Sequence, residues 1–279
     1  FAMISTFHHT ARLGLGLDIV DALTGAAIGR PKSGTYRLGD VVGLDTLGHV
    51  IRTLTTYLPS DPWHPHYQIP EALARLVEKG ALGQKTGAGF YRKQGKDILV
   101  LDITAGDYRP SGQQPSDEVT AILKIREAGE RLAKLRDSTD PQAQFLWSIQ
   151  RDLFHYAAVH LADIADSARE VDFAMRWGYG WKQGPFESWQ AAGWQQVAGW
   201  IKADIDAGKA MSSAPLPDWV FDGRSSVHSD AGSYSASSGM ISARSSHPVY
   251  TRQLFPDALL GESARTGTTL FENAGVRLW

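Results

Sequence analysis

One sequence pattern occurs twice in this chain, about 150 residues apart, and it constrains the fold more than any other feature. Each copy runs from an aspartate through a glycine-containing loop to an aromatic residue and a further glycine. The matched pairs are Asp21 with Asp172, Gly29 with Gly180, Gly34 with Gly184, Tyr36 with Phe186, and Gly43 with Gly193. An apolar helix pattern precedes each copy. Because self-similarity at a fixed offset is typical of one supersecondary unit used twice, the sequence predicts a mainly α fold with a duplicated helical domain.

The composition excludes several classes of protein. The chain has 279 residues, of which 43% are apolar, so it can bury a sizeable core in one or two domains. A formal charge of −2 and scattered basic residues argue against nucleic acid or an anionic membrane as partners. The absence of cysteine excludes disulfides and thiolate sites, and it fits a cytoplasmic location. No run of 18 apolar residues is present, so no membrane span is expected.

Apolar residues at three- and four-residue steps, together with helix-end signals, predict a series of helices. We expect them at residues 1–25, 40–58, 70–80, 116–136, 142–167 and 194–207. Ser116 should cap the fourth of these, because acidic residues follow it and basic residues lie in the last turn. Residues 98–101 are β-prone and precede a turn signal, so they are expected to pair with residues 108–109 in a small β-hairpin.

These signals divide the chain into four segments. They are a first helical repeat at 1–95, a hairpin and connecting helix at 96–141, a second repeat at 142–222, and a connector at 223–279. Residues 225–246 contain ten serines, a composition typical of a flexible linker, yet we expect this irregular extension to dock on the rest of the chain. Both ends look cut, since Phe1 lies inside an apolar pattern and residues 275–279 alternate like the start of a strand. We therefore expect a missing downstream domain.

Three sequence words in order resemble the C-terminal region of 3-hydroxyacyl-CoA dehydrogenases. They lie at residues 29–38, 42–46 and 82–91, and the second copy repeats part of the first at Gly184-Pro185-Phe186-Glu187. The resemblance covers roughly residues 1–222 and implies an all-helical, duplicated domain that packs against an N-terminal Rossmann domain and helps to shape an acyl-CoA cleft. Residues 223–279 resemble the connector that leads, in multifunctional relatives, into a crotonase-like enoyl-CoA hydratase domain.

The resemblance also implies that this chain is part of a longer parent protein, and that the catalytic parts of that protein lie outside this chain. The family's glycine-rich NAD fingerprint and its histidine–glutamate pair are both absent here, so we expect no catalytic residue, no bound cofactor and no metal in this chain. The parent would be an NAD-dependent 3-hydroxyacyl-CoA dehydrogenase of fatty-acid β-oxidation. This piece would be a substrate-side and assembly domain that is inactive alone. The alternatives are a helical dimerisation or docking scaffold with no ligand contact, or an unrelated helical adaptor.

The loop between the first two helical stretches supplies the candidate substrate-binding residues. By resemblance it would face the acyl-CoA cleft, and a positive, proline-stiffened loop suits a ligand with phosphates; a solvated basic loop is the alternative. The candidates are Arg30, Pro31, Lys32, Ser33 and Tyr36. The corresponding loop of the second copy, at 182–186, is expected to keep only a structural role. A possible homodimer remains among the expected partners.

Three other features have competing interpretations. Residues 85–90 could present backbone N–H groups and a lysine to a phosphate of coenzyme A, but a tight glycine turn is favoured. His64 and His66 form no recognised metal pattern and are expected to be polar loop residues. The tryptophans between residues 177 and 200 are interleaved with a single basic residue, Lys182, so they are expected to serve packing. A Gly34→Val change should disturb its loop, whereas His66→Ala should be nearly silent.

Overall fold

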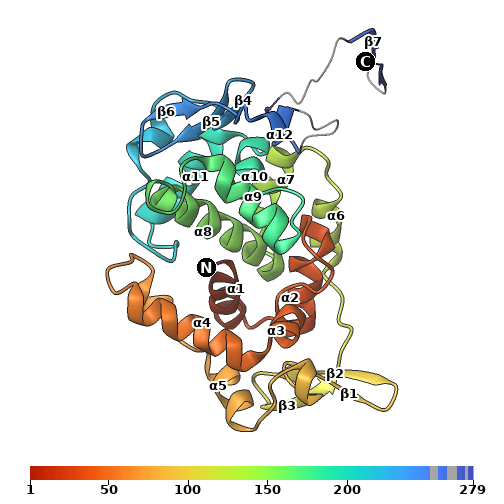
Figure 1. Cartoon of the computed structure of the whole chain (residues 1–279). Helices are drawn as coiled ribbons and strands as arrows, with labels where there is room; N and C mark the ends of the chain where they lie inside the picture. The colour runs from red at the N-terminus through yellow and green to blue at the C-terminus, as the bar shows by residue number, and fades with distance from the viewer. Residues whose placement is uncertain (252–256, 263–268, 274–275, 279) are drawn as a thin grey trace.

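Helices dominate the chain, as the apolar periodicity predicts (Figure 1). The computed structural model describes residues 1–251, 257–262, 269–273 and 276–278. In this part it contains twelve α-helices, short 3₁₀ turns and three small antiparallel sheets, so the expected mainly α fold with a duplicated helical unit is confirmed. The 3₁₀ turns lie at Ala26–Ile28, His64–His66, Gln84–Thr86 and Asp218–Phe221.

Five helices make up the first copy. They are α1 (Ala2–Leu13), α2 (Leu17–Thr24), α3 (Tyr36–Val42), α4 (Leu44–Tyr57) and α5 (Glu71–Glu78). The single helix expected over 1–25 is wrong: Gly14 adopts a φ of 63°, a left-handed conformation that ends α1. Likewise Gly43, with a φ of 101°, separates α3 from α4, so the helix expected at 40–58 begins at Leu44.

The second copy repeats the order of the first. Its helices are α8 (Pro141–Ile164), α9 (Ala168–Tyr179), α10 (Pro185–Ala191) and α11 (Trp194–Asp206). Helix α8 packs along α1, its counterpart, near the middle of the molecule (Figure 1). The long helix expected at 142–167 is confirmed in place and length. Ile164, however, was expected on its buried side and is 57% exposed, because it lies in the last turn at the rim of the packed layer.

A sheet and two helices connect the copies. Strands β1 (Tyr91–Gln94), β2 (Asp97–Asp102) and β3 (Asp107–Pro110) form an antiparallel sheet in that order. The expected hairpin is present as β2 and β3. Strand β1, which pairs with β2, lies within residues 1–95, the segment expected to form the first repeat. Ser116 caps α6 (Asp117–Leu123) by accepting a hydrogen bond from the Val119 N–H. The expected continuous helix is wrong, because α7 (Ala128–Asp137) starts anew with Glu127 as its cap.

The serine-rich segment folds into regular structure and is not a flexible linker. It forms a second sheet from β4 (His228–Ser229), β5 (Gly232–Ser235) and β6 (Met240–Ser242), and strand β5 contacts α9. Ser233, Tyr234 and Ser235 are buried, which agrees with the expected docking. A short helix α12 (Pro248–Thr251) follows, and β7 (Phe271–Glu272) pairs with β8 (Arg277–Leu278). Of the strand expected at residues 275–279, Arg277 and Leu278 form β8, whereas Gly275 and Trp279 lie outside the described residues.

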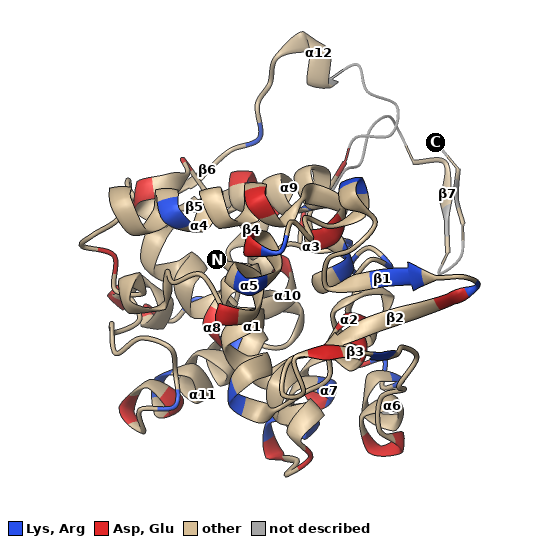
Figure 2. Cartoon of the chain, turned by 90° about the horizontal axis from the view of Figure 1, so that it is seen from below, with Lys and Arg blue, Asp and Glu red and all other residues tan. Residues whose placement is uncertain are grey.

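One hydrophobic core runs through both copies. It includes the fully buried rings of Trp63, Trp147, Trp189 and Trp194. Of the tryptophans between residues 177 and 200, Trp189 and Trp194 are thus in the core and Trp200 packs against it, as expected, whereas Trp177 is 67% exposed. None of the described helices combines the length and apolarity that crossing a bilayer requires. Figure 2 shows acidic and basic residues interspersed over the elements on the side drawn.

Candidate functional site

A buried carboxylate fixes the loop that carries the candidate residues. Asp21 Oδ1 accepts hydrogen bonds from the backbone N–H groups of Thr35 and Tyr36 at 2.7 and 2.6 Å, and Oδ2 accepts one from Arg37 at 3.0 Å. These are the orphan donors at the start of α3, so Asp21 caps that helix from a distance. A Cβ on Gly34 would lie 2.6 Å from Asp21 Cα, which explains why glycine occupies this position.

The second copy contains the same device. Asp172 accepts hydrogen bonds from the N–H groups of Phe186 and Glu187 at 2.9 and 2.8 Å, at the start of α10. A Cβ on Gly184 would fall 2.2 Å from Asp172 Oδ1. The paired residues of the sequence pattern therefore have the same structural role, and the two loops they fix face each other.

The two fixed loops meet through equivalent residues. The Lys182 N–H donates to the Gly29 carbonyl at 2.8 Å, and a Cβ on Gly29 would touch the Lys182 side chain at 3.3 Å. Reciprocally, a Cβ on Gly180 would touch Pro31 at 3.3 Å. Since Gly29 matches Gly180 and Pro31 matches Lys182 in the repeat, the contact is nearly self-complementary, as across a two-fold axis. The second loop was expected to be purely structural, and the structure places it directly against the first.

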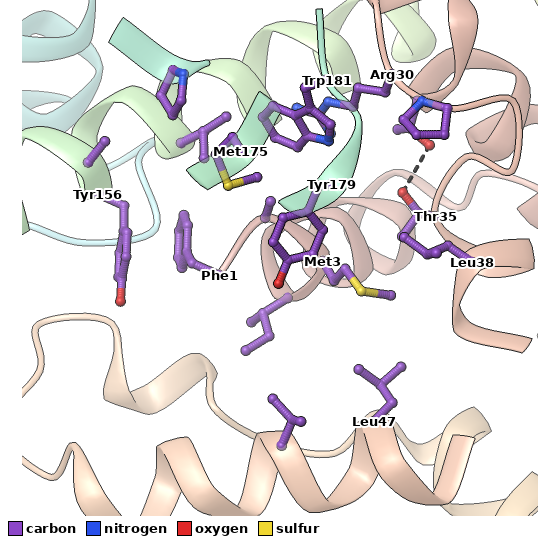
Figure 3. A pocket seen from close by; sticks show the side chains of 18 of the residues that line it. Phe1, Met3, Arg30, Thr35, Leu38, Leu47, Tyr156, Met175, Tyr179 and Trp181 are labelled. Atoms are coloured by element: carbon purple, nitrogen blue, oxygen red, sulfur yellow. Dashed lines mark hydrogen bonds between the residues drawn. The ribbon is translucent and has the colours of Figure 1, made fainter. Parts of the chain in front are cut away.

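An apolar cavity of about 280 Å³ lies beside this junction (Figure 3). Both copies line it: α1, the 30–35 loop and α4 from the first, and α8, α9 and the 181–185 loop from the second. Its wall contains Phe1, Met3, Ile4, Leu38, Leu47, Val50, Ile51, Leu54, Leu153, Tyr156, Ile164, Val171, Met175 and Tyr179. A concave, mostly apolar cavity with a few polar groups is the usual form of a small-molecule site.

The five candidate residues separate into two groups. Arg30 and Pro31 line the cavity. Lys32 is exposed and Ser33 is half-buried, and neither lines it. Tyr36 is 2% exposed and packs in the core against Phe7 and Phe90.

Arg30 is the one charged side chain among the described residues that line the cavity. Its guanidinium carbon lies 3.8 Å from the centroid of the Trp181 ring, and Figure 3 shows the two side chains together at one end of the cavity. Burial lowers the pKa of Arg30 to about 9. Sequence reasoning missed Trp181, although it matches Arg30 in the repeat, immediately after Gly180.

The glycine turn after α5 is structural. Asp40 accepts hydrogen bonds from the N–H groups of Phe90 and Tyr91, both at 2.8 Å, and a Cβ on Gly89 would lie 2.0 Å from its carboxylate. Lys85 donates to both carboxylate oxygens of Asp45 at 2.7 Å. Two resident carboxylates, of Asp40 and Asp45, thus accept hydrogen bonds from these backbone N–H groups and from the lysine. Phe90 and Tyr91 are buried, so the favoured interpretation of residues 85–90 as a tight glycine turn is confirmed.

Other chemically suggestive groups serve the fold. His64 and His66 each bond a backbone carbonyl, of Leu58 and Met211. Across the described ranges, no three His, Asp or Glu side chains are arranged to hold a metal ion. A third group has the composition of an acyl-transfer triad, with His228 between Asp172 and Ser233 at 2.8 and 2.9 Å, but all three are buried and none lines the cavity.

Known proteins match this chain in a consistent way. Residues 1–93 match the family described as "3-hydroxyacyl-CoA dehydrogenase, C-terminal domain". A probable 3-hydroxyacyl-CoA dehydrogenase of Bacillus subtilis is 36% identical over 219 residues, which are 75% of this chain and 28% of that protein. A putative fatty acid oxidation complex trifunctional enzyme of Rickettsia felis is 29% identical over 191 residues, 65% of this chain and 25% of that protein.

A shorter match points the same way. A probable 3-hydroxyacyl-CoA dehydrogenase of Deinococcus radiodurans is 36% identical over 93 residues, 33% of this chain and 26% of that protein. The chain thus spans about a quarter of the length of these curated relatives. Its homologues are 3-hydroxyacyl-CoA dehydrogenases, and residues 1–93 correspond to the C-terminal domain of that family.

Proposed function

We propose that this chain is the substrate-side and assembly part of an NAD-dependent 3-hydroxyacyl-CoA dehydrogenase of fatty-acid β-oxidation, and that it does not itself transfer hydride. The homologues supply the reaction class. Within the proposal, NAD and the proton-handling residues belong to the parent's Rossmann domain, and the parent works in the cytoplasm. The trifunctional relatives support a parent that also carries a crotonase-like domain.

The cavity at the junction of the two copies carries this proposal. Its wall is apolar and suits an acyl chain, since each buried CH₂ group contributes about 0.8 kcal/mol to binding. Arg30 and Pro31 enter this wall from the loop that bears one of the family's sequence words. In this function Arg30 attracts the anionic part of the ligand, Pro31 stiffens the loop, and Lys32 adds positive charge at the loop surface.

Binding of acyl-CoA tests the proposal directly. The chain is titrated with acetoacetyl-CoA and with a long-chain acyl-CoA, with free coenzyme A as control, and tryptophan fluorescence is followed. We expect saturable quenching by the long-chain ligand, because Trp181 lines the cavity. No response to any acyl-CoA would contradict the substrate-side role. Oxidation of NADH with acetoacetyl-CoA by the pure chain would contradict the non-catalytic role.

A scaffold without ligand contact is the second candidate, and the interface between the copies supports it. His9 of α1 meets Asp152 of α8 at 2.6 Å, and Arg151 bridges Asp152 to Asp204 at 3.0 Å on both sides. This buried network is a means of fixing how the two copies are oriented. A dimer-scale mass together with no affinity for acyl-CoA would favour the scaffold.

A further inference from the structure

The charge of Arg30 is unusual in its surroundings. The guanidinium is half-buried at one end of an apolar cavity, and within the described part of the chain no carboxylate forms an ion pair with it. A partly desolvated cation without a counter-ion is costly, since burial of a charge is normally offset by pairing. In the described part of the chain, no polar group accepts a hydrogen bond from the guanidinium, and the two cavity hydroxyls, of Thr24 and Thr35, bond to each other at 2.9 Å. Among the described residues, no acidic group therefore neutralises this charge, and an anionic ligand can fill that role.

The second copy holds this cation in place. The guanidinium lies over the Trp181 ring at 3.8 Å, a geometry in which the ring face attracts the charge. The backbone of the same loop is fixed by the Lys182 N–H bond to Gly29 and by the close approach of Gly180 to Pro31. This contact with the ring does not consume the N–H donors of the guanidinium, and in the described part of the chain no hydrogen bond uses them, so they can bind a bidentate partner.

We propose that Trp181 is a positioning residue that holds Arg30 as the anion-recognising group of the cavity, so that the site is shared between the two repeats. The ligand class is an amphiphile: an apolar chain in the cavity and an anionic oxygen group, carboxylate or phosphate, on the Arg30 edge. This inference rests on the proposed acyl-CoA function and adds to it a residue from the second repeat and a charge requirement. The second repeat then has a part in recognition as well as in assembly.

Comparison of charged and neutral ligands tests this inference. Decanoyl-CoA, decanoate and neutral 1-decanol are titrated by calorimetry into the 279-residue chain and into R30M, R30K, W181A and W181F. We expect R30M to lower the affinity for the two anionic ligands by about tenfold or more, as for a lost hydrogen bond to a charged group. The affinity for 1-decanol should stay within about twofold of the wild-type value. W181A should reproduce that selective loss, and W181F should restore part of it. The matched control is W177A, since Trp177 is an exposed tryptophan of α9 outside the cavity.

The outcomes separate this inference from the proposed function. Failure of the wild-type chain to bind any of the ligands would overturn both. Binding that R30M or W181A weakens equally for 1-decanol and for the anions would overturn the inference alone, because Arg30 and Trp181 would then only shape the wall. A selective loss with both anions supports a general anion site. A loss for decanoate but not for decanoyl-CoA supports a carboxylate as the anion, and the reverse supports a phosphate.

Discussion

Asp21 and Asp172 show how one side chain can set the geometry of a loop at the scale of single residues. Each lies in the second helix of its copy and bonds the first N–H groups of the helix that follows the loop. Space requires a glycine at both positions, since a Cβ on Gly34 or Gly184 would collide with the aspartate; at Gly34 the left-handed φ of 64° requires one as well. These contacts keep Arg30 and Pro31 at the cavity.

Replacement of Gly34 by alanine should therefore lower the free energy of unfolding by more than the left-handed backbone conformation at this position explains. Gly34 and Gly14 have nearly the same φ, 64° and 63°, but only Gly34 has heavy atoms in the way of a Cβ. We expect Gly14→Ala to cost about 1 kcal/mol, from the left-handed conformation, and Gly34→Ala about 2 kcal/mol beyond that, from the clash with Asp21. Chemical denaturation of both variants measures the difference. Equal costs would show that the loop yields to the new methyl group.

At the scale of elements, the two three-stranded sheets have corresponding roles. Strand β1 presents the Tyr91 hydroxyl to Asp21 Oδ2 at 2.8 Å, and β4 presents His228 Nε2 to Asp172 Oδ2 at the same distance. Each sheet thus completes the hydrogen bonds of one buried cap. The first sheet is also fastened to α2 by the ion pair of Arg109 with Asp18 at 2.8 Å. The serine-rich segment therefore belongs structurally with the second copy, because its first strand satisfies that copy's aspartate.

Removal of His228 should release this second sheet. His228→Ala deletes a buried imidazole and leaves Asp172 with fewer donors, so we expect a loss of about 3 kcal/mol in the free energy of unfolding. Limited proteolysis should then cut within residues 223–247, as followed by mass spectrometry. His247→Ala is the matched control, since that side chain is exposed. If the two variants resist protease equally, His228 does not hold the sheet.

At the scale of the whole molecule, the contact of α1 with α8 unites the copies and contains several buried histidines. Burial lowers the pKa of His8 and of His155 to about 4, and it also lowers the pKa of His9 despite the nearby Asp152. His8 faces the rings of His9 and His66, and Arg12 and Asp152 act on its charge as well. In the folded state these imidazoles are neutral at pH values where the unfolded chain binds protons.

Acidification should consequently weaken the molecule in a defined window. Since the folded pKa of His8 is lower than its unfolded value of 6.5, its contribution is complete above pH 6.5 and is lost as the pH falls toward 4. Burial raises the pKa of Asp21 and of Asp40 to about 6 in the folded state. Between about pH 6 and 3.8 the folded state therefore binds more protons at these two groups than the unfolded chain does, and their contribution to stability increases as the pH falls. The effect of His8 is therefore measured as a difference between variants.

The melting temperature of the His8→Gln variant should fall less between pH 6.5 and pH 4 than that of the wild-type chain. The same change at His49, an exposed residue of α4, should leave the wild-type pH profile unchanged. Thermal unfolding followed by circular dichroism across this range measures both profiles. Parallel profiles for His8→Gln and the wild-type chain would mean that protonation of His8 does not oppose folding.

Features that depend on neighbours along the chain could be predicted from the sequence alone. The paired aspartates and glycines showed the duplication, Ser116 marked the start of a helix, and apolar periodicity located α8. These signals are local, because caps, positive-φ glycines and helix stripes are read within a few residues. The helix breaks at Gly14 and after Leu123 escaped detection, since a continuous apolar pattern does not show whether a single glycine or a cap interrupts it.

The contacts between the two copies could not be predicted in this way, because they join residues far apart in the chain. Arg30 and Trp181 lie about 150 positions apart in the chain, and nothing local to either residue indicates that they stack. The cavity lies between the two copies, where α1 packs on α8 and the two loops meet. Tyr36 instead packs in the core of the first copy against Phe7 and Phe90, and Lys32 is exposed. Long-range burial, rather than residue type, determines which candidate residues line the cavity, and the sequence pattern carries no direct record of it.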